Sequence, residues 1–370
     1  MKKRYIQSAW LTVLLIIWGS LLTGCSEQSE PDVPQGEQLQ IRSLTRNSSE
    51  DQTGLAKGTS ILMYLAYWDS AENTTKSSSG YVTYSGKNNE NKDIWNSGVY
   101  VDVGNTYYIY GFMPSDMVKE SVITPAWSGN TVTGATMELK GVNALSVKDL
   151  CVIIGIGDGD NPANVVRGKF SYLAETEEDP VEGTRIKGIS LLMDHLYAAA
   201  NFKIMIDPNY NKLRTIKLKS MKFVCNSLTM YNKANVSIKL NNGQTNPIST
   251  ITTIQNTGQN ADTSPAEQTF FEDADGMELK ENESIIDVTG YFLPAYASSP
   301  STLSVVSTYD VYDKQGNKIR ENCEATNSLA SMLNGIQRGQ KRPIELTVNP
   351  TYLYVLSEPD LDNPTITIGN

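Results

Sequence analysis

Short runs of β-branched and aromatic residues recur along the whole chain, and they are the feature that most restricts its fold. Clusters of Gly, Asn, Asp, Ser and Pro bound these runs, as they bound the strands of a β-sandwich. The clearest runs are ILMYLAYW, TYYIYGFM, CVIIG, LRTIKLKSMKFVC, ANVSIKL, TLSVVSTYDVY, PIELTV, TYLYVL and TITIG. Helical periodicity is weak and no short repeat is visible, which disfavours solenoids and propellers. The sequence predicts an all-β protein with few short helices.

Three local patterns predict details of this fold. Tyr312 and Ile319 flank a turn that contains Gly316 and Asn317, which is typical of a β-hairpin. In TIKLKSMKF the apolar alternation changes phase at Ser220, which predicts a β-bulge. The segment ATNSLASMLNGI predicts a single short helix, with Asn327 as its N-cap and Gly335 at its end.

The first 25 residues have the features of an export signal. The basic residues Lys2, Lys3 and Arg4 are followed by an apolar segment, Trp10 to Leu22. This segment is shorter than the roughly 18 apolar residues that a membrane-spanning helix needs. It ends in Leu-Leu-Thr-Gly-Cys at residues 21–25, which matches a bacterial lipobox and predicts lipidation of Cys25. Ser26 follows instead of an aspartate, so we expect an outer-membrane lipoprotein that faces the cell surface.

Residues 26–46 are interpreted as a polar tether that leads into a removable first strand. The tether is acidic and nearly free of apolar residues, so it cannot offset its ordering entropy. Leu39 and Ile41 then alternate with polar residues. More than 300 residues remain, which predicts two domains, at 47–185 and 186–370. The boundary is placed in the acidic segment 174–185.

Charge and cysteine usage exclude several classes of protein. The net charge is −10 and no basic stripe is interleaved with aromatic residues, so nucleic acid is not an expected partner. Beyond Cys25, the chain has three widely spaced cysteines, Cys151, Cys225 and Cys323. Cys151 and Cys225 lie in apolar runs and are interpreted as buried free thiols. The chain has no CxxC pair, so a structural zinc site is not expected. No other metal site and no cofactor is predicted.

Motifs for catalysis are also lacking. His195 is the only histidine, and its apolar neighbours favour a hydrogen-bonded structural role over that of a catalytic base. GIGDGDN is interpreted as a loop, because no helix start follows it. The pairs Asp158/Asp160, Asp273/Asp275 and Asp360/Asp362 lack the continuation of a calcium loop and are interpreted as turn formers. The sequence therefore predicts a protein that is not an enzyme.

A lipobox, an acidic tether, an arginine-bearing strand and two β-rich halves together resemble the fimbrillin family, the type V pilins of Bacteroides-like bacteria. The more specific parts of the resemblance are ISLLMDHLYAAANFKIMI and RPIELTVNPTYLYVLSEPDLDNPTITIGN. It implies two tandem transthyretin-like β-sandwich domains. It also implies export as a lipoprotein and removal of the first strand by an arginine-specific protease. On this chain the cut would follow Arg46, or alternatively Arg42.

The resemblance further implies that the exposed groove is filled by a strand from another subunit, in many cases a C-terminal one. Here that donor would lie within Thr351 to Gly369. Tyr352, Tyr354 and Leu356 share one face of a strand, and Ile366 and Ile368 share one face of another. The alternative is that both runs are the last strands of the chain's own C-terminal domain.

The leading hypothesis is a structural subunit of a pilus that supports adhesion. Its partners would be other pilin subunits, the maturing protease, the outer membrane through the lipid, and host or bacterial surface receptors. Its mature form would reside in the fimbrium. The alternative is a surface lipoprotein that stays anchored and binds glycans or acts as an adhesin, for which Trp68, Trp95 and Trp127 are the available stacking platforms. A surface hydrolase is disfavoured by the single histidine.

Overall fold

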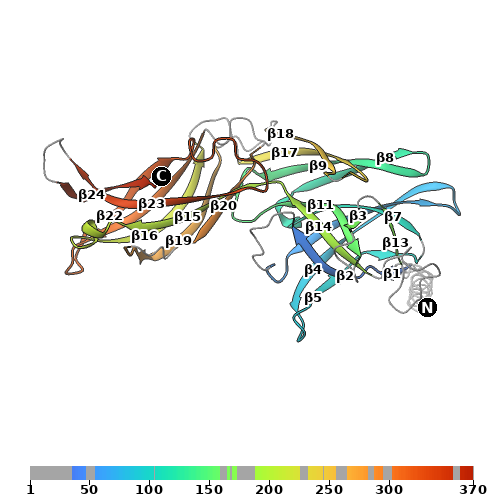
Figure 1. Ribbon diagram of the computed structural model, residues 1–370, viewed down its shortest axis with the longest axis horizontal. Coiled ribbons are helices and arrows are strands. Elements are labelled where there is room, and N and C mark those ends of the chain that lie inside the picture. Colours follow the sequence, from blue (N-terminus) through green and yellow to red (C-terminus); the bar gives the residue numbers. More distant parts are fainter. Residues whose placement is uncertain are drawn as a thin grey trace, which may run out of the picture. The chain divides into compact units, whose positions relative to one another are not determined.

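The computed structural model describes residues 36–46, 55–103, 105–158, 165–166, 169–172, 188–225, 232–244, 246–255, 265–281, 287–294, 302–352 and 359–369. Strands make up nearly all of the regular structure in these ranges (Figure 1). The short helical segments described are η1 (Ser115–Met117) and α2 (Pro208–Asn211). The predicted all-β sandwich fold is confirmed. None of the helices described has the length and apolar character needed to cross a membrane.

The largest sheet has nine strands and contains the first long strands of the chain. Its main path runs β2-β14-β11-β7-β3-β4-β5, with β12 added beside β11 and β13 beside β7. The bounds are β2 Ile41–Arg46, β14 Ile189–His195, β11 Cys151–Asp158, β7 Thr106–Met113, β3 Ser60–Asp69, β4 Thr74–Lys87, β5 Asp93–Ser97, β12 Val165–Val166 and β13 Lys169–Ser171. A separate two-stranded sheet pairs β1 (Glu37–Gln38) with β6 (Tyr100–Val101). β2 and β5 are thus the ends of the main path.

Both faces of the central strand β7 of this nine-stranded sheet are buried. Tyr107, Ile109 and Met113 lie in one hydrophobic cluster, which also holds Leu39 and Ile41. The alternate residues Tyr108, Tyr110 and Phe112 lie in a second, larger cluster, which includes apolar residues of β9 and β17. Successive side chains of a strand point to opposite faces of the sheet. Because β7 is buried on both faces, its sequence is a nearly continuous apolar run.

Three smaller sheets complete the structure. One has the order β18-β17-β9-β8, one the order β19-β16-β21-β22, and one the order β10-β20-β15-β23-β24. The bounds are β8 Glu120–Ser128, β9 Thr131–Asn143, β10 Leu145–Ser146, β15 Ala198–Ile206, β16 Thr215–Cys225, β17 Lys233–Asn241, β18 Ile248–Gln255, β19 Glu267–Glu278, β20 Val288–Phe292, β21 Leu303–Tyr312, β22 Lys318–Ser328, β23 Lys341–Tyr352 and β24 Pro359–Ile368.

Aromatic rings join the five-stranded sheet to the four-stranded sheet of β16 and β19. The rings of Phe202 and Phe270 stack with their centroids 5.0 Å apart, and Phe223 meets Phe202 edge-on at 5.7 Å. Such ring pairs are worth about 0.5–1.5 kcal/mol beyond the area they bury. Gly290 of β20 makes room for this cluster, because a Cβ atom there would lie 2.2 Å from Phe223 Cε2.

Strands from the two sides of residue 185 pair directly with one another. β9 pairs with β17, β10 with β20, and β11 with β14, each time in antiparallel fashion. The predicted boundary segment 174–185 lies outside the described residues. The bounds of the two predicted domains, and their transthyretin-like topology, stay predictions.

Two of the three local predictions are confirmed. The register of β16 shifts between Leu218 and Ser220 against both of its neighbours, which is the predicted bulge. β21 and β22 form the predicted hairpin, in which Gly316 has φ +87° and Asp313 Oδ1 accepts hydrogen bonds from the amides of Gln315 and Asn317.

The predicted helix at 325–336 is wrong. Residues up to Ser328 belong to β22, and residues 330–335 form turns that contain a Leu333 N to Leu329 O hydrogen bond of 2.9 Å. Asn327 caps no helix, since its side chain donates 2.7 Å to the Ile366 carbonyl oxygen. Six residues between a strand and Gly335 allow only one helical turn, which is too short to propagate.

Candidate functional site

The arginine-bearing segment predicted to be a first strand is β2, and it lies at the edge of the nine-stranded sheet. β2 runs parallel to β14, with Ile41 opposite Ile189 and Leu44 opposite Leu191 (Figure 1). Leu39 and Ile41 are buried in the cluster beneath the sheet, and Leu44 packs against it. Burying one such side chain contributes about 1.5–3 kcal/mol. Residues 37–46 therefore fill apolar positions of the core, while they pair with β6 through β1 and with β14 through β2.

The two candidate cleavage sites occupy different positions in β2. Arg42 lies inside the strand and is half-buried. Its side chain packs closely over Gly188, because a Cβ atom added to that glycine would lie 3.0 Å from Arg42 Nε and 3.2 Å from Arg42 Cγ. Arg46 is the last residue of β2. A protease binds its substrate as an extended chain that must first leave the sheet, so the end of a strand is opened more easily than its middle. This placement favours Arg46 over Arg42.

The C-terminal segment with the predicted donor residues pairs with the chain's own β23. β24 is antiparallel to β23 at the edge of the five-stranded sheet, with Ile366 opposite Val348 and Ile368 opposite Leu346. Ile366 is buried, and Ile368 packs against the larger cluster. Both residues thus contribute to the chain's own core in this structure.

Neighbouring strands also hold β24. Tyr309 Oη donates 3.1 Å to the Pro364 carbonyl oxygen, and Arg214 forms an ion pair of 2.6 Å with Asp362. Burial raises the pKa of Tyr309 to about 12, so its hydroxyl stays protonated and donates at neutral pH. Tyr352 is the last residue of β23, whereas Tyr354 and Leu356 lie outside the described residues, as does Cys25.

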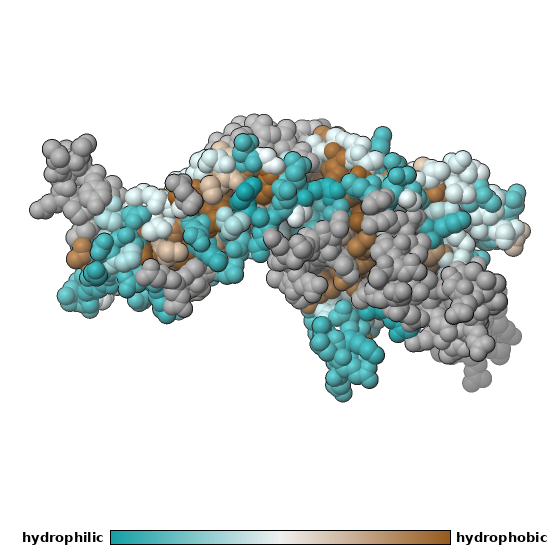
Figure 2. All heavy atoms as spheres, in the orientation of Figure 1, coloured by the Kyte–Doolittle hydropathy of each residue, from teal (hydrophilic) through white to brown (hydrophobic). Residues whose placement is uncertain are grey.

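The tryptophans do not form an exposed stacking platform. Trp68, Trp95 and Trp127 are all half-buried; Trp95 packs on Tyr84, with ring centroids 5.1 Å apart, and Trp127 packs edge-on against Tyr108. In Figure 2, hydrophilic, neutral and hydrophobic residues are interspersed over the coloured part of the surface. The exposed large apolar side chains described come from separate elements: Tyr81, Ile94, Tyr100, Val122, Val147, Leu213, Ile254 and Ile319.

The described aspartates weighed as calcium ligands lie within strands: Asp158 in β11, Asp273 and Asp275 in β19, and Asp360 and Asp362 in β24. Among them Asp273 forms a local turn inside its strand, whereas Asp360 and Asp362 were wrongly interpreted as turn formers. Asp273 Oδ1 accepts hydrogen bonds from the backbone amides of Asp275 and Gly276, at 3.0 and 3.2 Å. Asp362 is engaged with Arg214. Asp160 lies outside the described residues.

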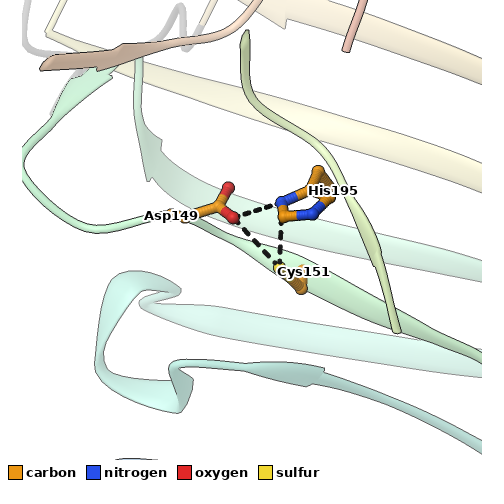
Figure 3. A group of neighbouring side chains, drawn as sticks. All are labelled: Asp149, Cys151 and His195. Atoms are coloured by element: carbon orange, nitrogen blue, oxygen red, sulfur yellow. Dashed lines mark hydrogen bonds and ion pairs between the residues drawn. The ribbon is translucent and has the colours of Figure 1, made fainter. Parts of the chain in front are cut away.

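His195 takes part in a buried cluster of side chains that sequence reasoning did not assemble. It is hydrogen-bonded through Nδ1 to Asp149 Oδ2, as expected for a structural histidine, and Cys151 lies beside both (Figure 3). The Cys151 Sγ atom is 3.3 Å from Asp149 Oδ2 and 3.6 Å from His195 Nδ1. Cys151, Cys225 and Cys323 form no disulfide bonds, and the first two are buried as predicted.

Comparison with solved structures finds matches over most of the chain at low sequence identity and low TM-score. No protein-family model matches the sequence, and no curated protein matches it. A fimbrial protein from Bacteroides vulgatus superposes with a TM-score of 0.41 and 12% identity, over 90% of this chain and 98% of that one. A candidate cell adhesion protein from Bacteroides uniformis gives 0.42 and 12%, over 91% and 98%. The fimbrial anchor protein Mfa2 from Porphyromonas gingivalis gives 0.27 and 12%, over 88% and 95%.

Proposed function

We propose that the chain is a structural subunit of a surface fimbrium, that it has no enzymatic activity, and that removal of β2 activates it for assembly. One observation carries the proposal. Within the described residues β2 is an edge strand that pairs with β14, buries Ile41 and ends at Arg46, and Leu39, two residues before it, is buried as well. Cutting after Arg46 would detach a segment that only non-covalent contacts hold to the sheet.

Loss of β2 would leave a binding site for another strand. The backbone N–H and C=O groups on one edge of β14 would lose their partners, and the positions of Leu39 and Ile41 in the core would open to water. An unpaired edge beside an apolar trough is the arrangement that recruits an added strand. In the proposed assembly that strand comes from another pilin subunit, and β24 is the candidate donor.

Export and location complete the proposal. Lipidation of Cys25 would attach the precursor to the outer membrane, and the cut after Arg46 would release the body from this anchor into the fimbrium. The proposed partners are other subunits, an arginine-specific protease, membrane lipid and surface receptors that support adhesion.

Mass spectrometry of the surface protein tests this order of events. Fimbrial material sheared from cells should contain a chain that begins at Asn47, or at Ser43 if the cut follows Arg42. An Arg46→Ala, Arg42→Ala double variant should stay in the membrane fraction and form no polymer, while a matched Arg214→Ala variant should still be cut. A polymer built from subunits that retain residues 26–46 would contradict the proposal. A mature wild-type chain that keeps these residues, stays in the membrane fraction and forms no polymer would favour an anchored adhesin.

A further inference from the structure

Asp149, Cys151 and His195 carry side chains that converge, although they come from distant parts of the sequence. Cys151 begins β11, His195 ends β14, and the two residues are direct antiparallel partners. Cross-strand partners project their side chains to the same face of a sheet. Asp149 lies two residues before Cys151, and the backbone of Leu150 between them accepts a 2.8 Å hydrogen bond from the Leu196 amide. Local chain geometry therefore places all three side chains on one side (Figure 3).

We propose that this cluster is a site for Zn²⁺, with Asp149 oxygen, Cys151 sulfur and His195 Nδ1 as ligands and water as the fourth. These donor atoms all lie within 4.8 Å of one another, and all three residues are buried. A tetrahedral zinc ion with ordinary bond lengths needs sulfur–nitrogen and sulfur–oxygen separations of about 3.5 Å. The observed separations are 3.6 and 3.3 Å. Only the Asp149–His195 pair, now hydrogen-bonded, must move apart to admit the ion.

The arrangement differs from that of a catalytic triad. In a triad the carboxylate binds one ring nitrogen of the histidine and the nucleophile faces the other, so that a proton passes through the ring. Here the Asp149 oxygen and the Cys151 sulfur both lie beside Nδ1. Moreover, the Cys151 side chain is fully buried, which closes it to a substrate. Three donors around one point suit a cation.

The carboxylate of Asp149 supplies an independent sign of a missing partner. Its Oδ1 atom is buried and has no hydrogen-bond partner among the described residues, and the residue as a whole is 8% exposed. A buried carboxylate oxygen without a partner is costly, and such groups commonly mark an ion or water site. Rotation of this carboxylate would let either oxygen bind the ion while the hydrogen bond to His195 opens.

Charge balance and the donor types select the ion. A thiolate, a carboxylate and a neutral imidazole together carry two negative charges, which a divalent cation neutralises in a buried site. Sulfur and imidazole donors favour zinc over calcium and magnesium. On binding, the Cys151 sulfur–hydrogen bond breaks, its electron pair forms the zinc–sulfur bond and the proton leaves to solvent. The His195 ring proton leaves Nδ1, whose lone pair forms the zinc–nitrogen bond, and Nε2 takes up a proton from water, so the imidazole stays neutral; no oxidation or reduction occurs.

The surroundings hold the ligands and provide access. Asp194 Oδ1 accepts a hydrogen bond of 2.9 Å from the His195 backbone amide. Arg338 donates hydrogen bonds to Asp194 Oδ2 and to the His195 carbonyl oxygen. Outer contacts of this kind fix the orientation of a ligand. A pocket of about 460 Å³ lies alongside, with Asp149, Lys148, Ser115 and Tyr291 among its lining residues. It offers a route for the ion and space for the water ligand.

Titration of the full chain with metal tests the site. The protein must lack a histidine tag, because His195 is its only histidine, and it should be reduced and metal-free at the start. Calorimetry with ZnCl₂ should give one ion per chain, and CaCl₂ should give no binding. The Asp149→Asn, Cys151→Ser and His195→Gln variants should each bind zinc at least tenfold more weakly. The matched control Cys225→Ser removes another buried thiol and should bind as wild type does.

Cobalt gives a second readout that needs no variant. Co²⁺ bound to the wild-type chain should show the near-ultraviolet absorption of a thiolate–cobalt bond and the visible bands of tetrahedral cobalt. These bands should be absent from Cys151→Ser and present in Cys225→Ser. Failure of the folded wild-type chain to bind Zn²⁺, a cobalt spectrum without thiolate absorption, or unchanged zinc affinity in a folded Cys151→Ser chain would each overturn the proposal.

Discussion

At the scale of single residues, Asp310 shows how one side chain stabilises an irregularity between two strands. The pairing of β21 with β22 shifts register between Tyr309 and Val311, and Asn322 there adopts φ +51°. Asp310 Oδ1 accepts 2.8 Å from the Asn322 amide, and Oδ2 forms an ion pair of 2.9 Å with Lys318. Burial acts to raise the pKa of Asp310, but the Asn322 amide and the Lys318 ammonium outweigh it and hold the pKa below its usual range.

We expect Asp310→Asn to lower the free energy of unfolding by about 1–3 kcal/mol at pH 7, because it removes the charged acceptor that binds the Asn322 amide and the Lys318 ammonium. The folded-state pKa is depressed, so this stabilisation is complete above the unfolded-state pKa of about 3.9 and is lost as pH falls through the folded-state pKa. Urea unfolding of both proteins at pH 7 and at pH 3 checks this. A difference that is equally large at both pH values would show that the charge plays no part.

The close approach at Gly290 makes a second prediction. A methyl group there would overlap the Phe223 ring, so Gly290→Ala should cost about 1–3 kcal/mol through forced repacking. The control is Gly369→Ala, whose Cβ would meet its nearest atoms at an ordinary 3.6 Å and should be nearly neutral. Urea midpoints of the two variants give the comparison, and equal midpoints would argue against overlap.

At the scale of elements, β2 combines a buried apolar face with a single pairing partner. The contribution of β2 to stability can be measured by supplying its segment as a separate peptide to a chain that lacks it. A chain that begins at Asn47 should bind a synthetic peptide of residues 36–46 and gain thermal stability from it. The same peptide with Leu39→Asp and Ile41→Asp should not bind, since each charge would replace a buried apolar group. Fluorescence anisotropy of a labelled peptide gives both affinities; equal binding would mean that the apolar face is irrelevant.

β24 leads to a prediction of the opposite kind, because its residues lie in the chain's own core. Ile366→Ser should lower the free energy of unfolding by about 2–5 kcal/mol. The control Ile319→Ser changes an isoleucine that is 36% exposed. It should change the free energy of unfolding by no more than about 0.5 kcal/mol. Chemical denaturation of monomeric protein compares them. A neutral Ile366→Ser would indicate that β24 is detached in solution.

At the scale of the whole molecule, the strand pairings bind sequence on either side of residue 185 into shared sheets. β17 and β18 extend the sheet of β8 and β9, and β14 pairs with β11. Fragments 47–185 and 186–370 would each lack partners for several strands. We expect neither fragment to give a dispersed amide NMR spectrum alone, and the two to recover it only when mixed. A well-dispersed spectrum from fragment 47–185 alone would contradict this.

Local patterns allowed the strands, the bulge near Ser220, the Gly316 hairpin and a buried His195 to be predicted. The alternation of apolar residues and the backbone preferences of turn residues are encoded within a few positions of the chain. The turn at 330–335 was mistaken for a helix because helical composition says nothing about where the preceding strand ends. The cluster around His195 was missed because it depends on the pairing of Cys151 with His195. The register between two strands that are distant in the sequence cannot be inferred from the residues of either strand alone.

The two strands on which the proposed assembly depends belong to different sheets, β2 to the nine-stranded sheet and β24 to the five-stranded one. A subunit that receives a strand in place of β2 and gives β24 would use two unlike surfaces for its two neighbours. Such a contact is heterologous, so it has no two-fold axis and does not close on itself as a dimer does. The resulting fibre would be polar, with chemically distinct ends.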